Sequence, residues 1–256
     1  MGMNKRIVAL FLLGLVVSGC VTDSSQSYVK EGVQYGVTEG VFRGRWWSYY
    51  ERGASYLAGD FTQEAVADLQ KALEGNSRDT WRARTYGLHF VEYFPNRELG
   101  IAYLKLGQVE EAERYLMRSL EQVDTDRAHF FLDQVKKEKI ARGVITDGAE
   151  PGIRTSLADG AFLNQRALNL EVGADDDVGV YQLAVNGRPI HLRGSGQQVA
   201  HEEPLLLDEG QHQFNVEATD LADKAVSQAV TVTVDLTGPT IGVLSPAEGL
   251  VTQASS

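Results

Sequence analysis

Three patterns of hydrophobic and polar residues follow one another along this chain of 256 residues. Residues 7–17 form a short and almost unbroken apolar run. Residues 41–142 carry apolar positions at the three- and four-residue spacing of amphipathic helices. Residues 147–235 alternate in the manner of strands and include Asn186-Gly187, a strong hairpin turn signal. Helices followed by strands indicate separate domains, so we predict a multidomain α plus β protein.

The helical pattern repeats itself once. Five positions of the first unit return 47 residues later with the same internal spacing and the same or similar residue types. Small residues at such positions let two helices touch, and larger residues fill the groove between them. We therefore predict close helix packing at these residues: Gly53, Tyr56, Ala65 and Ala72 in the first unit, and Gly100, Tyr103 and Ala112 in the second.

This spacing resembles the tetratricopeptide repeat (TPR), a helix–turn–helix unit of about 34 residues. The second copy matches better, through LGIAY at residues 99–103, Leu106-Gly107 and Glu111-Ala112. The offset of 47 leaves thirteen extra residues around positions 79–95, which we interpret as an extra helix or packed loop with buried aromatic side chains. The resemblance implies a TPR-like helical domain over residues 41–142, with a groove that binds a protein or peptide partner.

The strand-rich half has a longer repeat. The motif Asp147-x-x-x-Pro151-x-Ile153 returns 88 residues later, beginning at Asp235. A unit of this length with several short antiparallel strands suits a β-sandwich. Residues 181–187 (YQLAVNG), 209–212 (EGQH) and 217–223 (EATDLAD) resemble bacterial immunoglobulin-like modules of the glucodextranase accessory type. We expect an all-β immunoglobulin-like sandwich over residues 147–235, then the truncated and flexible start of a second sandwich over residues 236–256.

The first residues resemble the export signal of a bacterial lipoprotein. Lys5 and Arg6 precede the apolar run, and Val17-Ser18-Gly19 leads into Cys20, the chain's one cysteine. The run is shorter than the roughly 20 residues of a membrane-spanning helix. Resemblance to the lipobox implies a signal peptide over residues 1–19, acylation of Cys20, and a lipidated N-terminus and linker over residues 20–40. The alternative is an ordinary signal peptide with an incidental buried cysteine.

The residues after Cys20 bear on localisation. In the enteric sorting rule for lipoproteins, an aspartate directly after the lipidated cysteine retains the protein in the inner membrane, whereas here Val21 and Thr22 follow it. We therefore expect a lipid anchor in the bacterial cell envelope, at the outer membrane facing the periplasm. The whole chain also resembles proteobacterial lipoproteins that join TPR units to immunoglobulin-like modules, some of which carry a caspase-like peptidase farther along.

Charge is concentrated in the second half of the chain. Residues 143–256 hold 5 basic and 16 acidic residues, whereas residues 21–142 are nearly balanced. Such a half repels nucleic acid, so no nucleic-acid partner is expected. Three adjacent carboxylates there repel one another unless they are solvated or bound to a cation, and calcium prefers oxygen ligands from loops. The candidate calcium ligands are Asp175, Asp176 and Asp177, joined by Asp220 and Asp223; the alternative is a solvated loop between strands.

Other chemistry is sparse. The five histidines lack metal-ligand spacing, and no phosphate loop or nucleophile elbow occurs, so we predict a protein that is not an enzyme and needs no other cofactor. The cluster of Arg43, Arg45, Trp46 and Trp47 either grips an anion or glycan, or packs its arginine stems along an aromatic edge.

The leading hypothesis is a membrane-anchored lipoprotein that acts as a protein-interaction scaffold, because helical repeats form surfaces suited to extended ligands. One alternative is the N-terminal part of a larger envelope enzyme, a caspase-like peptidase whose catalytic domain is absent from this sequence. Another is a carbohydrate-binding or adhesion module.

Replacing Cys20 by serine removes the thiol that the lipobox resemblance implies is acylated. We expect Cys20→Ser to release the protein from membranes or to mislocalise it, since the acyl chains supply the anchor. Membrane fractionation measures this. Quantitative recovery of the variant with the membrane fraction would contradict the lipoprotein assignment.

Overall fold

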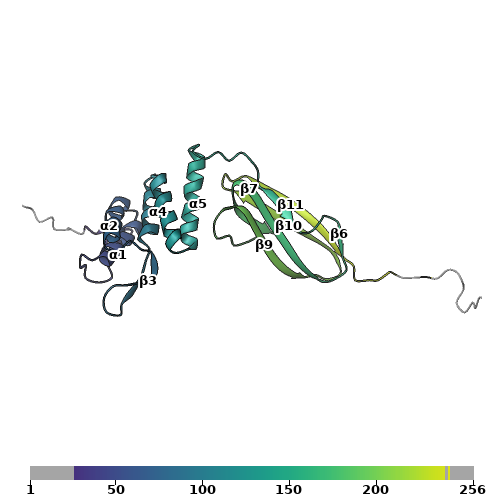
Figure 1. Cartoon of the computed structure of the whole chain (residues 1–256), viewed down its shortest axis with the longest axis horizontal. Helices are drawn as coiled ribbons and strands as arrows, with labels where there is room; N and C mark the ends of the chain where they lie inside the picture. The colour runs from purple at the N-terminus through teal and green to yellow at the C-terminus, as the bar shows by residue number, and fades with distance from the viewer. Residues whose placement is uncertain (1–25, 240–241, 243–256) are drawn as a thin grey trace, which may run out of the picture.

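The structure is a computed structural model that describes residues 26–239 and 242. Within this part, five helices lie at one end and a large curled sheet lies at the other (Figure 1), so the predicted mixture of α and β architecture is confirmed. Cys20 and most of residues 236–256 lie outside the described residues. Among the residues described, no helix has the length and apolar character needed to cross a membrane.

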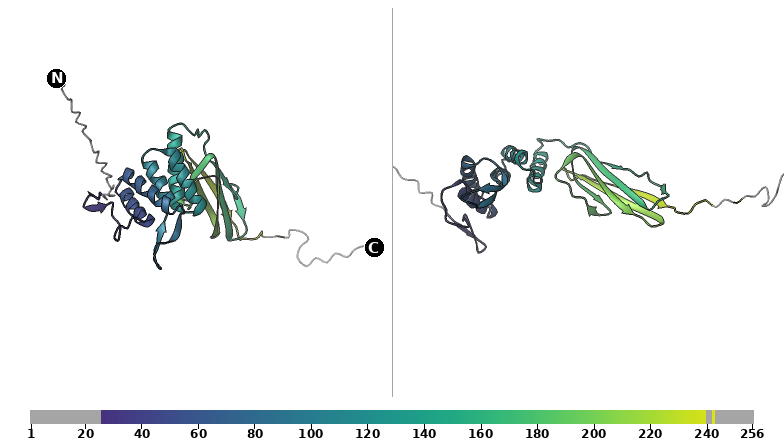
Figure 2. Two further views of the ribbon diagram at one scale, coloured as in Figure 1. Left: turned by 60° about the vertical axis from the view of Figure 1, so that its left-hand side comes forward. Right: turned by 60° about the horizontal axis from the view of Figure 1, so that its bottom comes forward.

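The helices pack in chain order, each against the next, and α5 lies next to the sheet in Figures 1 and 2. Pro95 opens α3 at a position where its missing N–H is not needed. The Thr125 hydroxyl caps α5 by accepting a hydrogen bond from the Ala128 backbone N–H. The helices are α1 (Trp46–Ala58), α2 (Thr62–Gly75), α3 (Pro95–Lys105), α4 (Val109–Gln122) and α5 (Asp126–Ala141).

The pairs α1–α2 and α3–α4 pack through the same kind of contact. A Cβ atom added to Gly53 would lie 2.9 Å from Leu69 Cγ, and one added to Gly100 would lie 2.6 Å from Leu116 Cγ. The same glycine–leucine contact therefore joins α1 to α2 and α3 to α4, 47 positions apart. The repeat-packing alanines, Ala65, Ala72 and Ala112, are fully buried.

The two repeat tyrosines differ in their surroundings. The Tyr56 hydroxyl donates a hydrogen bond of 2.6 Å to the Gln26 carbonyl, and so ties the start of the described chain to α1. The Tyr103 hydroxyl accepts one of 2.8 Å from Gln70 Nε2, and so ties α3 to α2.

Residues 79–95 contain a β-hairpin, β3 (Thr80–Arg84) and β4 (Phe90–Tyr93), so the prediction of a helix or packed loop was wrong. Aromatic and β-branched residues dominate this stretch and favour an extended backbone. Tyr93 is fully buried, as predicted, but Trp81 and Tyr86 are exposed. The hairpin extends away from the helices in Figure 1.

A second small hairpin, β1 (Tyr28–Lys30) and β2 (Val33–Tyr35), lies within the stretch expected to be a linker. The Tyr28 ring stacks on Phe61 with centroids 4.2 Å apart, and its hydroxyl bonds Glu64 of α2. These contacts add residues 28–35 to the helical end of the molecule.

The remaining strands form one seven-stranded sheet with the order β5-β7-β10-β11-β6, in which β8 and β9 also pair with β7. Pairing is antiparallel except between β11 and β6. The strands are β5 (Gly152–Thr155), β6 (Ala161–Leu163), β7 (Ala167–Val185), β8 (Arg188–Pro189), β9 (Gly196–Leu206), β10 (Gly210–Asp220) and β11 (Ala225–Val234).

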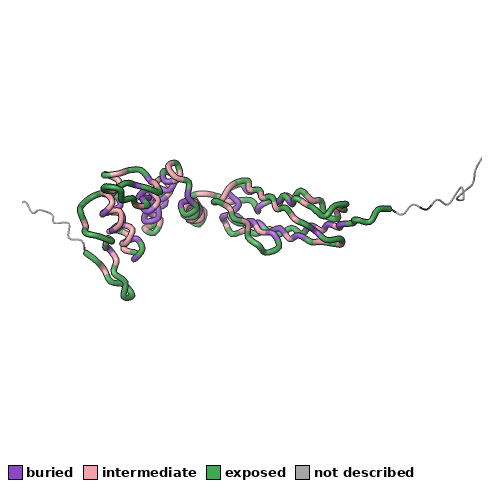
Figure 3. The backbone as a smooth tube through the Cα atoms, turned by 90° about the horizontal axis from the view of Figure 1, so that it is seen from below, coloured by how far each residue is buried: buried purple, intermediate pink, exposed green. Residues whose placement is uncertain are grey.

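The long strand β7 makes the sheet curl. Its first half pairs with β5 and β9, its second half pairs chiefly with β8 and β10, and the register breaks between Asp175 and Val180. Side chains from both halves, including Leu170 and Leu183, join one core that is separate from the helical core. Figure 3 shows these two buried regions. Residues 175–177 therefore lie within β7, and the alternative of a solvated loop between strands was wrong for them.

Replacing Gly100 by leucine should destabilise the helices, because the new side chain would overlap Leu116 and approach the Ala112 carbonyl. We expect a loss of about 1–3 kcal/mol in the free energy of unfolding, measured by denaturant titration. Gly40→Leu is the control, since a Cβ atom there meets no described atom within 4 Å. Equal stability of Gly100→Leu and the parent chain would refute the close-packing account.

Candidate functional site

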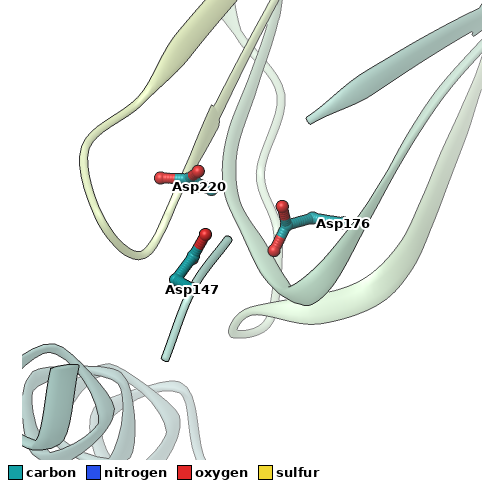
Figure 4. A group of neighbouring side chains, drawn as sticks. All are labelled: Asp147, Asp176 and Asp220. Atoms are coloured by element: carbon teal, nitrogen blue, oxygen red, sulfur yellow. The ribbon is translucent and has the colours of Figure 1, made fainter. Parts of the chain in front are cut away.

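Three aspartates from distant parts of the sequence meet at the end of the sheet near the helices (Figure 4). Asp147 lies in the connection between α5 and β5, Asp176 lies at the break in β7, and Asp220 ends β10. One oxygen from each carboxylate lies within 4.8 Å of the other two. We call this cluster the acidic centre.

Local turns fix two of these side chains. Asp176 Oδ2 accepts hydrogen bonds from the backbone N–H groups of Val178 (2.9 Å) and Gly179 (2.6 Å), where β7 changes direction. Asp220 Oδ1 accepts from the N–H groups of Ala222 and Lys224, both at 2.8 Å, where β10 turns toward β11. The backbone at both turns therefore requires a carboxylate or a similar acceptor.

The second oxygens of the acidic centre have no such partners. Asp147 Oδ2, Asp176 Oδ1 and Asp220 Oδ2 are buried and make no hydrogen bond with any described residue. Asp220 is 0% exposed, Asp176 is 8% exposed, and the side chain of Asp147 is 1% exposed. Burial of unpaired carboxylate oxygens is costly, so the cluster calls for a positive group.

Lys224 supplies one positive charge. Its ammonium pairs with Asp147 Oδ1, lies 3.8 Å from Asp220 Oδ2, and donates to the carbonyls of Asp147 (3.0 Å) and Ala149 (2.6 Å). Burial raises the pKa of the Asp220 carboxyl, and the neighbouring Asp147 charge adds to that rise, while backbone N–H groups and Lys224 oppose it. Three ionised carboxylates and one ammonium leave a net charge of −2.

The predicted cation ligands divide into two groups. Asp176 and Asp220 belong to the acidic centre, whereas Asp175 pairs with Arg154 at 3.1 Å and Asp177 accepts a hydrogen bond from the Gly148 N–H. Asp223 lies exposed and pairs with Lys137 of α5 at 2.6 Å.

Sequence reasoning missed Asp147 as a member of the acidic centre. One signal was present, because Asp147 opens the motif that returns at Asp235. Asp235 itself is exposed and accepts hydrogen bonds from Thr237, which hold its pKa below the usual range.

The acidic centre borders the joint between α5 and the sheet. Asp133 of α5 accepts hydrogen bonds from the Ser195 hydroxyl (2.5 Å) and N–H (2.9 Å). Asp124 contacts His129 Nε2 and Arg193, both at 2.7 Å, and these contacts, His129 first, lower the pKa of its carboxyl. A cavity of about 560 Å³ lies at this joint and is lined by Asp133 together with Phe130, Tyr181 and Ile190. The joint therefore combines polar contacts with a cavity whose lining is mainly apolar.

A second candidate site lies between α1 and the β3–β4 hairpin. Its cavity of about 290 Å³ is lined by Arg43, Trp47, Glu51, Tyr86 and His89, among others. The Tyr86 ring stacks on His89 with centroids 5.2 Å apart, and the Arg43 guanidinium lies 5.7 Å from the Tyr86 centroid. Burial raises the pKa of the Glu51 carboxyl, and the Glu39 charge adds to it. We call this site the hairpin pocket.

The structure divides the predicted basic-aromatic cluster. Arg43 and Trp47 line the hairpin pocket, whereas Trp46 packs on Tyr93 with centroids 4.5 Å apart. Arg45 is exposed and directly precedes α1. Half of the cluster therefore faces a cavity, and Trp46 belongs to the packing between α1 and the hairpin.

Comparison with protein-family models gives no match, and comparison with curated proteins gives none either. Among solved structures, the chain is similar to fibronectin(III)-like modules of CbhA from Clostridium thermocellum, with 23% identity, a TM-score of 0.26, and coverage of 38% of this chain and 54% of that one. It is also similar to an FMN-binding beta-glucuronidase from Facaelibacterium prausnitzii L2-6, with 11% identity and a TM-score of 0.23. This similarity covers 70% of this chain and 30% of that one. The chain thus spans about half of the first structure and under a third of the second. Similarities this small assign neither a fold family nor a function.

The acidic centre leads to a prediction about Asp220 in solution without divalent cations. Asp220→Asn keeps an acceptor for the two backbone N–H groups. It also places an amide beside the oxygens of Asp147 and Asp176 that make no hydrogen bond with the described residues. We therefore expect this variant to be as stable as the parent chain or more stable. Asp220→Ala removes the acceptor and should cost about 1–3 kcal/mol. Thermal unfolding in EDTA compares the two variants, and an equal loss in both would contradict this description of the centre.

Proposed function

We propose that this chain is a membrane-anchored lipoprotein of the bacterial cell envelope that acts as a protein-interaction scaffold. Acylated Cys20 is the anchor, at the outer membrane facing the periplasm. A TPR-like helical domain binds a protein segment, and an immunoglobulin-like sandwich acts as a spacer. The observation that carries the proposal is the exposed apolar surface of the β3–β4 hairpin beside the hairpin pocket.

The hairpin exposes four large aromatic or aliphatic side chains. Trp81 is 53% exposed, Tyr86 56%, Leu88 87% and Phe90 40%. Concentrated apolar surface of this kind marks protein interaction sites more often than isolated exposed residues do. Aromatic residues are also enriched at the centres of protein interfaces.

The hairpin is held firmly enough to present this surface. Asp79, fully buried at its base, accepts hydrogen bonds from Asn96 N (3.0 Å) and Nδ2 (2.8 Å) at the start of α3. The Tyr93 hydroxyl donates to the carbonyls of Ala72 (2.8 Å) and Asn76 (2.6 Å) at the end of α2. A preorganised surface loses less conformational entropy on binding.

The hairpin pocket indicates the chemistry of the partner. Trp47 and Tyr86 offer aromatic walls, while Arg43, Glu51 and His89 offer polar groups around them. A protein segment that presents a large apolar side chain flanked by polar groups suits this lining. An extended peptide of that kind is the ligand class we propose.

The repeated packing supports the TPR-like assignment. The glycine–leucine contact of α1 and α2 recurs in α3 and α4, and the hairpin between α2 and α3 accounts for an offset longer than that of a simple repeat. The single core inside a curled, mainly antiparallel sheet supports the immunoglobulin-like assignment.

The double variant Tyr86→Ser/Leu88→Ser should abolish most partner binding without changing the fold, because both side chains are more than half exposed. We expect at least a tenfold loss of any partner that the parent chain captures from detergent-solubilised envelopes, quantified by mass spectrometry, with an unchanged melting temperature. Phe162→Ser is the matched control, since Phe162 is 76% exposed on β6 of the sheet. Capture that is equal for the double variant and the parent chain would refute the hairpin as the binding surface.

A further inference from the structure

We propose that the acidic centre binds one calcium ion, which ties the connection after α5 to the sheet and stiffens the joint between them. The ligands are one carboxylate oxygen each from Asp147, Asp176 and Asp220. This inference is independent of the proposed function, since it uses neither the hairpin nor the lipid anchor.

The spacing of the oxygens suits one ion. Calcium binds oxygen at about 2.3–2.6 Å, so two ligands on opposite sides of it lie about 4.6–5.2 Å apart. The three oxygens lie within 4.8 Å of one another, which is in the range of oxygen–oxygen separations around a single calcium ion. Magnesium, with distances of about 2.0–2.1 Å and strict octahedral geometry, requires a tighter arrangement.

The unpartnered oxygens are the second and independent indication. Asp176 is more than nine-tenths buried, and its Oδ2 is satisfied by two backbone N–H groups, while Oδ1 makes no hydrogen bond with any residue that the structure describes. Asp147 Oδ2 makes no hydrogen bond with the described residues either, and Asp220 Oδ2 has only the Lys224 ammonium, 3.8 Å away. Figure 4 shows the Asp147 side chain pointing toward Asp220. Buried carboxylates are normally paired or bound to metal, so these oxygens indicate a missing cation.

The charge of the centre also matches a divalent ion. Lys224 neutralises one of the three carboxylates, and its ammonium is engaged mainly with Asp147 and the Ala149 carbonyl. The remaining charge of −2 equals the charge that one calcium ion balances. All the available ligands are oxygens, which calcium prefers, and no described sulfur or imidazole nitrogen belongs to the cluster.

The position of Asp147 gives the ion a structural effect. Asp147 lies six residues after the end of α5, and its neighbour Gly148 donates a hydrogen bond to Asp177 beside the break in β7. Lys137 of α5 reaches Asp223 in the turn after Asp220. An ion held by Asp147, Asp176 and Asp220 therefore fixes the connection at the point where helix and sheet already exchange polar contacts.

The proposal is tested by calorimetric titration with calcium chloride. The titrated sample is the full chain in detergent, first dialysed against EDTA. We expect one saturable site per chain and, at about a hundred times the dissociation constant, a melting temperature raised by about 5 °C or more. Asp176→Asn and Asp220→Asn should each weaken calcium binding at least tenfold. Both variants keep an acceptor for the backbone N–H groups, and melting curves in EDTA establish that each is folded.

Asp175→Asn is the matched control. It removes the same charge one position away, from a carboxylate paired with Arg154 outside the acidic centre, and it should bind calcium within twofold of the parent chain. No saturable binding by the parent chain at millimolar calcium would overturn the proposal and leave Lys224 as the resident cation. A loss in Asp175→Asn equal to that in Asp176→Asn would also overturn it, because it would indicate a diffuse effect of acidic surface.

Discussion

The burial of three carboxylates around a single lysine is the constraint on which the joint of this molecule depends. Asp176 and Asp220 are each required locally, because each satisfies two backbone N–H groups where a strand changes direction. The curl of the sheet brings these two turns together, and the connection from α5 adds Asp147. The turns that shape the sheet thus create a site whose charge they do not balance, and this imbalance is the basis of the proposed calcium site.

At the helical end of the molecule, small residues set the distance between neighbouring helices. Gly53 and Gly100 admit the side chains of Leu69 and Leu116 into direct contact with the helix backbone. Because each helix pair is packed through its own glycine–leucine contact, the segment between the two pairs can accommodate an insertion. The β3–β4 hairpin occupies that place, with Asp79 buried at its base and Trp81, Tyr86 and Leu88 exposed farther out.

Sequence reasoning predicted the parts governed by periodicity and missed those governed by tertiary placement. The equal spacing of the small residues anticipated which positions meet between helices, because helical geometry is regular. The hairpin at residues 79–95 was missed, since a short aromatic stretch is compatible with helix, loop and strand alike. Of the five predicted cation ligands, Asp175 and Asp177 were suggested by adjacency in sequence. Neighbouring residues along β7 point to opposite faces of the sheet, however. Only Asp176 and Asp220 of the five therefore belong to the acidic centre. Asp147 lies 29 residues from Asp176 in the sequence, and only the fold brings the two together.

A crystal structure of the full chain grown with calcium tests the central claim most directly. We expect an anomalous difference peak at the acidic centre, with oxygens of Asp147, Asp176 and Asp220 at about 2.3–2.6 Å from it. The ammonium of Lys224 should remain at the Ala149 carbonyl, beside the ion. A Lys224 ammonium at the middle of the three carboxylates, with no anomalous peak at millimolar calcium, would contradict the account.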